Sequence, residues 1–232
     1  MASDNTITEM EKKNAALEAL KFVTSGMIVG LGTGSTVRFF LDGLGKAVRR
    51  GIKVRCVATS RITESIAKSN GIEILDSLTE LIDLTVDGAD EIDRYGNLIK
   101  GGGGALLREK IVAANSKRLF IIADHTKLKD RLGSFKVPVE VFPFLDRLTK
   151  AKLEALNGKC YLREGFITDN GNLIYDCDFG LIERPEELEG KIKNIPGVAE
   201  VGIFTNLHPV VLIGDGESVR ELKLLNIRSG KT

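Results

Sequence analysis

Two acidic residues follow an apolar segment near the middle of the chain, in the run Asp87-Gly88-Ala89-Asp90-Glu91. The preceding residues, 84–86, are apolar or β-branched and predict a buried strand. Asp87 and Asp90 should therefore emerge at the carboxyl edge of a sheet, where open α/β folds bind their ligands. Carboxylates at such an edge serve as acid/base groups, metal ligands or turn caps, and their spacing alone leaves these roles open.

A run of four glycines, Gly101–Gly104, follows Lys100 and leads into a predicted helix over 105–114. Four consecutive glycines are costly in backbone entropy, and a linker would tolerate them. Because this run lies between a strand and a helix, we interpret it as a set of N–H donors facing a developing oxyanion, with Lys100 adding positive charge. Glu109 falls in the next turn and can reach back over the loop. A lone helical glutamate between two basic residues would otherwise be interpreted as solvated surface.

A second glycine-rich loop, Gly30-Leu31-Gly32-Thr33-Gly34-Ser35-Thr36, follows a predicted strand and opens a predicted helix. Its backbone N–H groups, hydroxyls and helix dipole favour a phosphate cradle, although a tight turn alone would also need glycines. It is not a dinucleotide fingerprint, because serine occupies the third glycine position and the next strand ends in Ala58-Thr59-Ser60 without an acid. No GxxxxGK[ST] motif occurs.

Composition narrows the class of protein. Of the 25 glycines, eleven fall in 30–45 and 88–104, so the excess over the usual 7% or so is concentrated in the two loops. The 33 basic and 32 acidic residues give a net charge of +1, which disfavours a nucleic-acid binder. An apolar content of 43% excludes a disordered chain.

The longest uncharged run, Phe22–Val37, contains four glycines and is not a membrane span, and no export signal is visible. We therefore expect a cytoplasmic protein.

The cysteines and histidines predict no metal site. Cys56, Cys160 and Cys177 form a sparse set without a CxxC motif, which we interpret as buried or strand residues in a reducing compartment. Neither His125 nor His208 has a partner at metal-ligand spacing. No cofactor is expected.

Alternating strands and helices must position these loops. A Ser/Thr-x-x-Glu pattern at Thr8–Glu11 predicts the start of a helix over 9–23. Further helices are predicted over 35–48, 63–70 and 105–114, and strands over 27–31, 54–58, 72–75, 84–86 and 118–123. This order predicts an α/β fold with a Rossmann-like parallel sheet sandwich.

The pattern changes after Asp130. Strands over 137–141, 160–168, 173–176 and 198–204, with helices over 146–156 and 185–195, give the order β-α-β-β-α-β of a small ferredoxin-like domain. The turn between its middle strands contains Asn170-Gly171. A strand over 210–214 and a helix over 217–225 are predicted to return to the first domain. We therefore expect a catalytic domain of residues 1–131 and 208–232 and a small α+β domain of residues 132–207.

Several long segments in this order resemble the type A ribose-5-phosphate isomerase family through nearly the whole chain. The segments that carry the resemblance are Ile28–Thr36, Val86–Glu91, Ile99–Leu106, Arg108–Lys110, Ala123–Lys127, Pro138–Val141, Thr168–Asn172 and Ile195–Val198. No departure falls at a chemically essential position.

The resemblance implies interconversion of D-ribose 5-phosphate and D-ribulose 5-phosphate through a 1,2-enediolate, without a metal, in the non-oxidative pentose phosphate pathway. It assigns the base to Glu109 and enediolate stabilisation to Lys100 and the glycine amides. Asp87 and Asp90 are assigned sugar contacts and either ring opening or proton transfer between oxygens. The implied substrate-binding residues are Lys12, Thr33, Gly34, Ser35, Thr36, Asp87, Gly88, Ala89, Asp90, Lys100, Gly101, Gly102, Gly103 and Lys127.

Two other functions fit parts of the pattern. A sugar-phosphate sensor of a transcription regulator shares this type of sheet and loop, but only about 26 residues precede the first strand, without a helix-turn-helix. An acyl-CoA transferase with a glutamate nucleophile normally needs a longer chain. The resemblance also implies a homodimer or homotetramer, with the small domain as its assembly surface, and no nucleic-acid or membrane partner.

Overall fold

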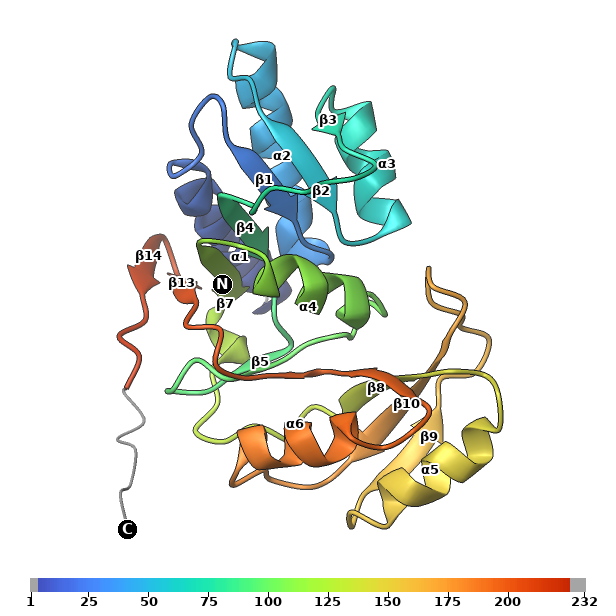
Figure 1. The fold of residues 1–232 in the computed structure, drawn as a ribbon. Coiled ribbons are helices and arrows are strands. Elements are labelled where there is room, and N and C mark those ends of the chain that lie inside the picture. The colour runs from blue at the N-terminus through green and yellow to red at the C-terminus, as the bar shows by residue number, and fades with distance from the viewer. Residues whose placement is uncertain (1–3, 226–232) are drawn as a thin grey trace.

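A seven-stranded sheet forms the larger part of the computed structural model, which describes residues 4–225 (Figure 1). Its strand order is β14-β13-β7-β4-β1-β2-β3, and all neighbours are parallel except β13 and β14. The strands are β1 (Ile28–Leu31), β2 (Arg55–Ala58), β3 (Glu73–Ile74), β4 (Leu84–Asp87), β7 (Leu119–Asp124), β13 (Val210–Asp215) and β14 (Ser218–Glu221). The predicted α/β fold with a parallel sheet is confirmed.

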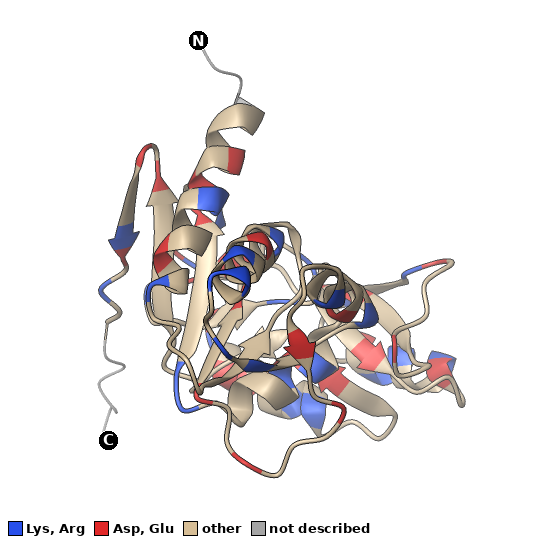
Figure 2. Ribbon diagram, turned by 90° about the horizontal axis from the view of Figure 1, so that it is seen from above, with Lys and Arg blue, Asp and Glu red and all other residues tan. Residues whose placement is uncertain are grey.

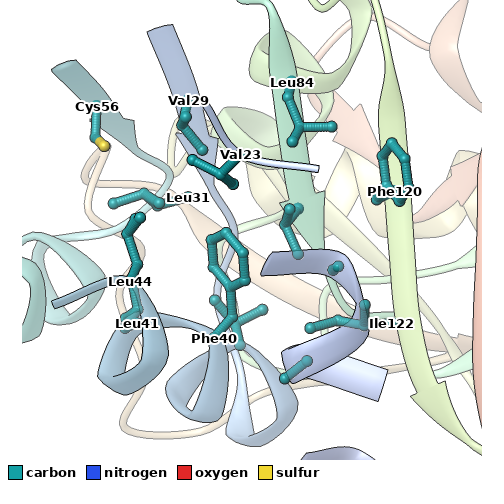
Figure 3. Packing of buried hydrophobic residues seen from close by; sticks show 14 of the residues in the cluster. Val23, Val29, Leu31, Phe40, Leu41, Leu44, Cys56, Leu84, Phe120 and Ile122 are labelled. Carbon is teal, nitrogen blue, oxygen red and sulfur yellow. The ribbon is translucent and has the colours of Figure 1, made fainter. Parts of the chain in front are cut away.

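Helices cover both faces of this sheet. The helices are α1 (Asp4–Leu20), α2 (Ser35–Arg49), α3 (Arg61–Ser69) and α4 (Leu106–Ala114). Figure 3 shows Phe40, Leu41 and Leu44 of α2 packed against residues of β1, β4 and β7. In β7, Phe120 and Ile122 join the α1–α2 core, whereas alternate residues join the core on the α4 side. Burial on both faces explains why the strands are apolar runs without alternation.

The smaller part of the molecule is a four-stranded sheet of order β11-β8-β10-β9 (Figure 1). It comprises β8 (Val137–Val141), α5 (Asp146–Glu154), β9 (Lys159–Leu162), β10 (Leu173–Asp178), α6 (Pro185–Lys193) and β11 (Val198–Val201), the predicted order of elements. A three-stranded sheet of β5 (Glu91–Ile92), β6 (Leu98–Ile99) and β12 (Ile203–Phe204) and a 3-10 turn η1 (His125–Lys127) were not predicted.

One predicted helix start and one predicted element are wrong. Helix α1 is already helical at Asp4, so Thr8 does not mark its start. The predicted helix over 217–225 is instead strand β14, paired antiparallel with β13. Gly216 and Glu217, with Gly216 at φ 59°, form the two-residue hairpin turn between them. Leu222 and Leu224 both pack against the core, which is the period of a strand.

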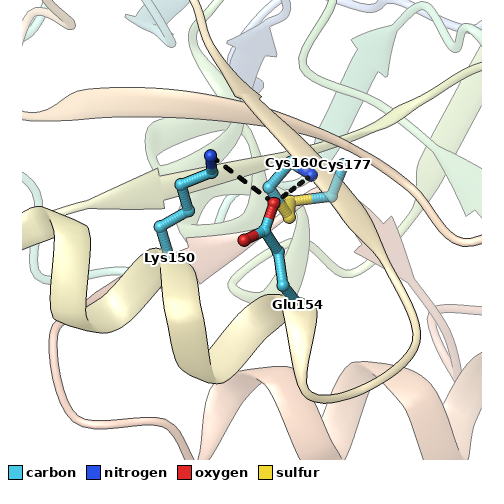
Figure 4. The surroundings of a disulfide bond; sticks show 4 residues. All are labelled: Lys150, Glu154, Cys160 and Cys177. Atoms are coloured by element: carbon cyan, nitrogen blue, oxygen red, sulfur yellow. Dashed lines mark hydrogen bonds and ion pairs between the residues drawn. A yellow bond between two sulfur atoms is a disulfide. The ribbon is translucent and has the colours of Figure 1, made fainter.

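A disulfide joins Cys160 of β9 to Cys177 of β10, directly opposite one another in the ladder. Figure 4 shows Glu154 of α5 beside it, accepting from the Cys160 N–H and pairing with Lys150. Cys56 is unpaired and buried. All three cysteines are buried as expected, but the pairing removes the support that the cysteine count gave to a reducing compartment.

The chain leaves β1 toward β2 and β3 on one side and later returns to β4 on the other side of β1. This reversal is a topological switch point, at which the loops after β1 and β4 lie side by side. Figure 2 shows Lys and Arg interspersed with Asp and Glu along the ribbon, as the near-zero net charge predicts. Within residues 4–225, no helix has the length and apolarity to cross a membrane.

Candidate active site

Asp87, Lys100 and Glu109 form a buried cluster at the switch point. The Lys100 ammonium lies 3.1 Å from Asp87 Oδ2 and 3.3 Å from Glu109 Oε2, and it donates to the Gly88 carbonyl at 2.6 Å. The three side chains are 1–3% exposed. Asp87 ends β4, Lys100 follows β6 and Glu109 lies in the first turn of α4, so three elements converge on one ammonium.

The cluster changes the protonation of all three groups. Burial raises the pKa of Glu109 from 4.5 to about 8, with Lys100 opposing the shift and the charge of Asp87 adding to it. Burial also raises the pKa of Asp87, against the stabilising charge of Lys100. Burial alone would lower the pKa of Lys100, but the two carboxylates outweigh it and raise that pKa. One ammonium faces two carboxylates, so Glu109 is poised to take a proton near neutral pH.

The first glycine loop wraps the Asp87 carboxylate. Asp87 Oδ1 accepts from the N–H of Gly88 at 2.7 Å and of Thr33 at 3.2 Å. A Cβ on Gly32 would lie 2.0 Å from Asp87 Oδ1, so only glycine lets the loop approach this closely. The Thr33 hydroxyl points instead into a group of hydroxyls from Thr59, Ser60 and Thr63 at 2.8–3.1 Å.

Asp90 fixes the second glycine loop. Its Oδ2 accepts from the Gly102 N–H at 2.8 Å, and a Cβ on Gly102 would lie 2.6 Å from Asp90 Oδ1. Gly101 and Gly104 have φ values of 103° and 78°, a region that favours glycine. The run of glycines therefore reflects a loop folded tightly over Asp90 rather than a flexible linker.

The predicted phosphate cradle opens to solvent at the start of α2. Gly34 and Ser35 are exposed there, and no side chain caps the helix N-terminus. Lys127 lies on η1, directly after β7, and the described residues contain no carboxylate paired with its ammonium. Lys12 of α1 is paired with Glu9 at 2.7 Å and makes no contact with the Asp87–Lys100–Glu109 cluster. The structure thus brings the acid/base residues together, with Lys12 and Lys127 outside that cluster.

Helix α4, which carries Glu109, is held by the neighbouring Lys110. The Lys110 ammonium pairs with Glu189 at 2.6 Å and Glu200 at 3.1 Å, and it donates to the Val201 and Ile203 carbonyls. Glu189 lies on α6, Glu200 and Val201 lie on β11 of the small sheet, and Ile203 lies on β12, so the segment α6–β12 anchors the helix of the candidate base.

Sequence reasoning missed two sets of residues. The first is the cluster of hydroxyls from Thr59, Ser60 and Thr63. The second is Arg163 and Phe166 of the β9–β10 loop, which contact the second glycine loop. The Ala58-Thr59-Ser60 run at the end of β2 could have indicated these hydroxyls, because it lies at the same carboxyl edge of the sheet as Asp87. No sequence pattern indicates Arg163 or Phe166.

A carboxylate of raised pKa, an ammonium and an array of backbone N–H donors suit proton abstraction next to a carbonyl. The positive charge between the carboxylates is the Lys100 ammonium. Within residues 4–225, no three His, Cys, Asp or Glu side chains are arranged to hold a metal ion.

Comparison with known proteins matches the chain to one named family. A family model described as ribose 5-phosphate isomerase A (phosphoriboisomerase A) matches residues 55–218. The chain is 48% identical over 216 residues to ribose-5-phosphate isomerase A of Thermoplasma volcanium, covering 90% of each. It is similar to the solved ribose 5-phosphate isomerase A of Methanocaldococcus jannaschii (TM-score 0.89, 39% identity, 95% of this chain and 100% of that one). A D-ribose-5-phosphate isomerase solved with phospho-erythronic acid is equally similar (TM-score 0.89, 41% identity, 93% and 98% covered).

Proposed function

The chain belongs to the ribose 5-phosphate isomerase A family, and from that premise we propose how its site works. The protein is an isomerase of ribose 5-phosphate, in pentose phosphate metabolism. The sensor alternative has no support, because the curated relatives of 44–48% identity are all named isomerases.

Glu109 is the proposed base that moves the proton between C2 and C1. Abstraction from C2 of the open-chain aldose gives a 1,2-enediolate with its negative charge on O1. A proton then passes from the C2 hydroxyl to O1, and return of the abstracted proton to C1 gives the ketose. The observation that carries this assignment is a buried Glu109 carboxyl whose pKa is raised to about 8, beside the Lys100 ammonium. A base with its pKa near the working pH is the most effective kind.

Lys100 and the amides of Gly101–Gly103 are proposed to stabilise the enediolate oxygen. Preorganised donors in a water-poor site are worth far more than in bulk water. Asp87 and Asp90 would hold sugar hydroxyls and assist either ring opening or the transfer of a proton between the C2 and C1 oxygens, with Gly88 and Ala89 as backbone contacts. The ion pair of Asp87 with Lys100 supports a shared role for the two residues.

For the phosphate, we propose the loop Thr33–Thr36 at the uncapped N-terminus of α2, with Lys127 and Lys12. Free N–H groups and the helix dipole there favour an anion. Because the Thr33 hydroxyl is already bonded to Thr59 and Ser60, the backbone N–H groups and the hydroxyls of Ser35 and Thr36 are the better donors.

We propose that the reaction needs no metal and no cofactor. The support is the charge arrangement, in which Lys100 supplies the positive charge that a Lewis acid would otherwise bring.

We further propose residues 1–131 and 208–232 as the catalytic unit and residues 132–207 as an assembly unit of a homodimer or homotetramer. The ends 1–3 and 226–232 lie outside the described residues. The apolar core of the small sheet comes from residues 132–203 apart from Ile99, which supports the division. Large apolar side chains are exposed near the start of α5 and on edge strand β9: Phe142, Phe144, Leu145, Leu148, Tyr161 and Leu162. Such a surface is typical of an assembly interface, which light scattering after size-exclusion chromatography tests.

A cytoplasmic location is also proposed, because a phosphorylated sugar does not diffuse across membranes and its isomerase must share its compartment. A disulfide is uncommon there, so fractionation of native cells is the test.

A coupled assay tests the activity directly. Purified protein is given ribose 5-phosphate, and ribulose 5-phosphate formation is followed before and after dialysis against EDTA. Equal turnover in both samples supports a metal-independent isomerase. Turnover lost with EDTA and restored by a divalent cation contradicts the metal-free proposal, and no turnover in either sample contradicts the function.

A further inference from the structure

Arg163 joins the small part of the molecule to the second glycine loop. It follows strand β9, and its Nη1 donates to the carbonyls of Gly101 and Gly102, each at 3.2 Å. The other side of the guanidinium forms a two-bond ion pair with Asp176 of β10. The Arg163 side chain is 19% exposed. Two strands therefore fix the guanidinium that holds two consecutive carbonyls of the loop.

Those two carbonyls set the direction of two N–H groups. In a planar trans peptide unit, the N–H points opposite to the carbonyl of the preceding residue. Holding the Gly101 and Gly102 carbonyls therefore aims the N–H groups of Gly102 and Gly103 away from Arg163. The Gly102 N–H meets Asp90 at 2.8 Å, and the Gly103 N–H has no partner among residues 4–225. A charged donor on the carbonyl also polarises the peptide unit and strengthens its N–H as a donor.

The segment that carries Arg163 is itself braced. Phe166 packs where a side chain on Gly104 would lie, with its Cζ 2.1 Å from the position of an added Cβ. At the far end of the β9–β10 loop, Thr168, Asn170 and Asn172 all donate to Oε1 of the buried Glu140 at 2.9–3.0 Å. The loop is thus fixed on both sides of its contact with the glycines.

We propose that Arg163 is a positioning residue for the isomerisation: it orients and polarises the peptide unit whose Gly103 N–H receives the enediolate oxygen, and it fixes the neighbouring Gly102 N–H on Asp90. This inference rests on the proposed function of that loop. Arg163 acts through Gly101 and Gly102 rather than on the substrate. Its removal should therefore slow the chemical step and leave unchanged the proposed phosphate contacts, which lie on the first glycine loop, η1 and α1.

Three variants test the proposal beside a matched control. Arg163→Met removes the guanidinium, and Arg163→Lys keeps the positive charge but loses the planar set of N–H donors. Asp176→Asn weakens the ion pair that holds the Arg163 guanidinium. The control is Arg131→Met, which removes an exposed arginine paired with Glu183 at 3.5 Å. Loss of one oxyanion donor typically lowers kcat by about 10²–10³-fold. We therefore expect Arg163→Met to lower kcat at least about tenfold, while its KM stays within about threefold of that of the parent protein. Arg163→Lys should recover part of the loss, and Asp176→Asn should show a smaller loss of the same kind.

Two further readouts separate positioning from general stability. The kinetic isotope effect with ribose 5-phosphate deuterated at C2 should grow in Arg163→Met, because proton abstraction becomes more fully rate-limiting. Hydrogen–deuterium exchange of the ligand-free protein should increase in the peptide covering Gly101–Gly104, while the core strand β7 stays protected as in the control. If Arg163→Met does not fold, Arg163→Lys and Asp176→Asn carry the same comparison.

The proposal is overturned if Arg163→Met and Asp176→Asn keep kcat within about twofold of the parent protein, or if exchange at Gly101–Gly104 does not change. The proposed function and the positioning role of Arg163 are contradicted by different results. A parent protein that does not isomerise ribose 5-phosphate contradicts the proposed function, whereas the exchange measurement needs no substrate and still decides whether Arg163 orders the glycine loop.

Discussion

The Lys100 ammonium lies 3.3 Å from Glu109 Oε2 while it also pairs with Asp87, and all three side chains are buried. A single positive charge between two carboxylates leaves the cluster short of one proton or one cation. The shortfall is relieved when Glu109 takes a proton, which is the event that abstraction from a sugar carbon requires. The same imbalance governs how the site should respond to substitution and to pH.

Lys100→Met should destabilise the protein as well as inactivate it. Removing one partner of a buried pair typically costs about 3–5 kcal/mol, which for a chain of this size lowers Tm by roughly 10 °C. The loss should be larger at pH 8 than at pH 6, because the two carboxyls can take up protons in place of the ammonium. Thermal unfolding at both pH values measures this.

Lys117→Met is the matched control, since its ion pair with Asp83 at 2.7 Å is largely exposed. Exposed pairs contribute little, so Tm should change by no more than about 2 °C. Equal losses in the two variants would contradict the buried-charge account.

The pH profile of kcat/KM should rise with pH through about 8. Glu109 acts as a base only when ionised, and its pKa in the folded protein is about 8. The ascending limb of kcat/KM reports the ionisation of the free enzyme. An ascending limb near pH 4.5, the ordinary range of a glutamate, would contradict the raised pKa.

Gly102→Ala and Gly103→Ala form a matched pair in the second glycine loop. A Cβ on Gly102 would lie 2.6 Å from Asp90 Oδ1, whereas a Cβ on Gly103 would meet nothing closer than Thr33 Cγ2 at 3.5 Å. We expect Gly102→Ala to reduce kcat at least about tenfold, since a displacement near 1 Å in a site can cost 10²-fold. Gly103→Ala should lose less than Gly102→Ala in the same coupled assay, and the reverse order would contradict the close packing of Asp90 on the loop.

Much of the site could be predicted from sequence because its parts lie at strand ends. Asp87 and Asp90 follow a short buried strand, so their place at the sheet edge follows from local pattern and the topology of parallel sheets. Arg163 could not be found this way, because it is 62 residues from Gly101 and their contact depends on how the β9–β10 loop packs. The helix predicted over 217–225 was wrong, although Gly216 stands at the first position of a two-residue turn, where hairpins favour glycine.

The disulfide between Cys160 and Cys177 should stabilise the hairpin that carries Arg163 and Asp176. It closes a separation of 17 residues, and a loop of about that length is worth about 3 kcal/mol. Cys160→Ser with Cys177→Ser should therefore lower Tm by roughly 6–12 °C. Dithiothreitol should lower the Tm of the parent protein and not that of the double variant. Parent and variant with equal Tm would show that the bond does not contribute.

Glu109→Gln tests the central claim most directly, because it keeps the shape of the side chain and removes the base. The variant should fold at least as stably at pH 8: the raised pKa of Glu109 means that its contribution to stability falls as pH rises from about 4.5 to 8, and glutamine has no such loss. Isomerisation of ribose 5-phosphate and exchange of its C2 proton with D₂O are measured by NMR, beside the parent protein. The account predicts that both rates fall at least about 100-fold while the KM for ribose 5-phosphate stays within about threefold. A folded Glu109→Gln variant that isomerises ribose 5-phosphate at a rate close to that of the parent would contradict Glu109 as the base.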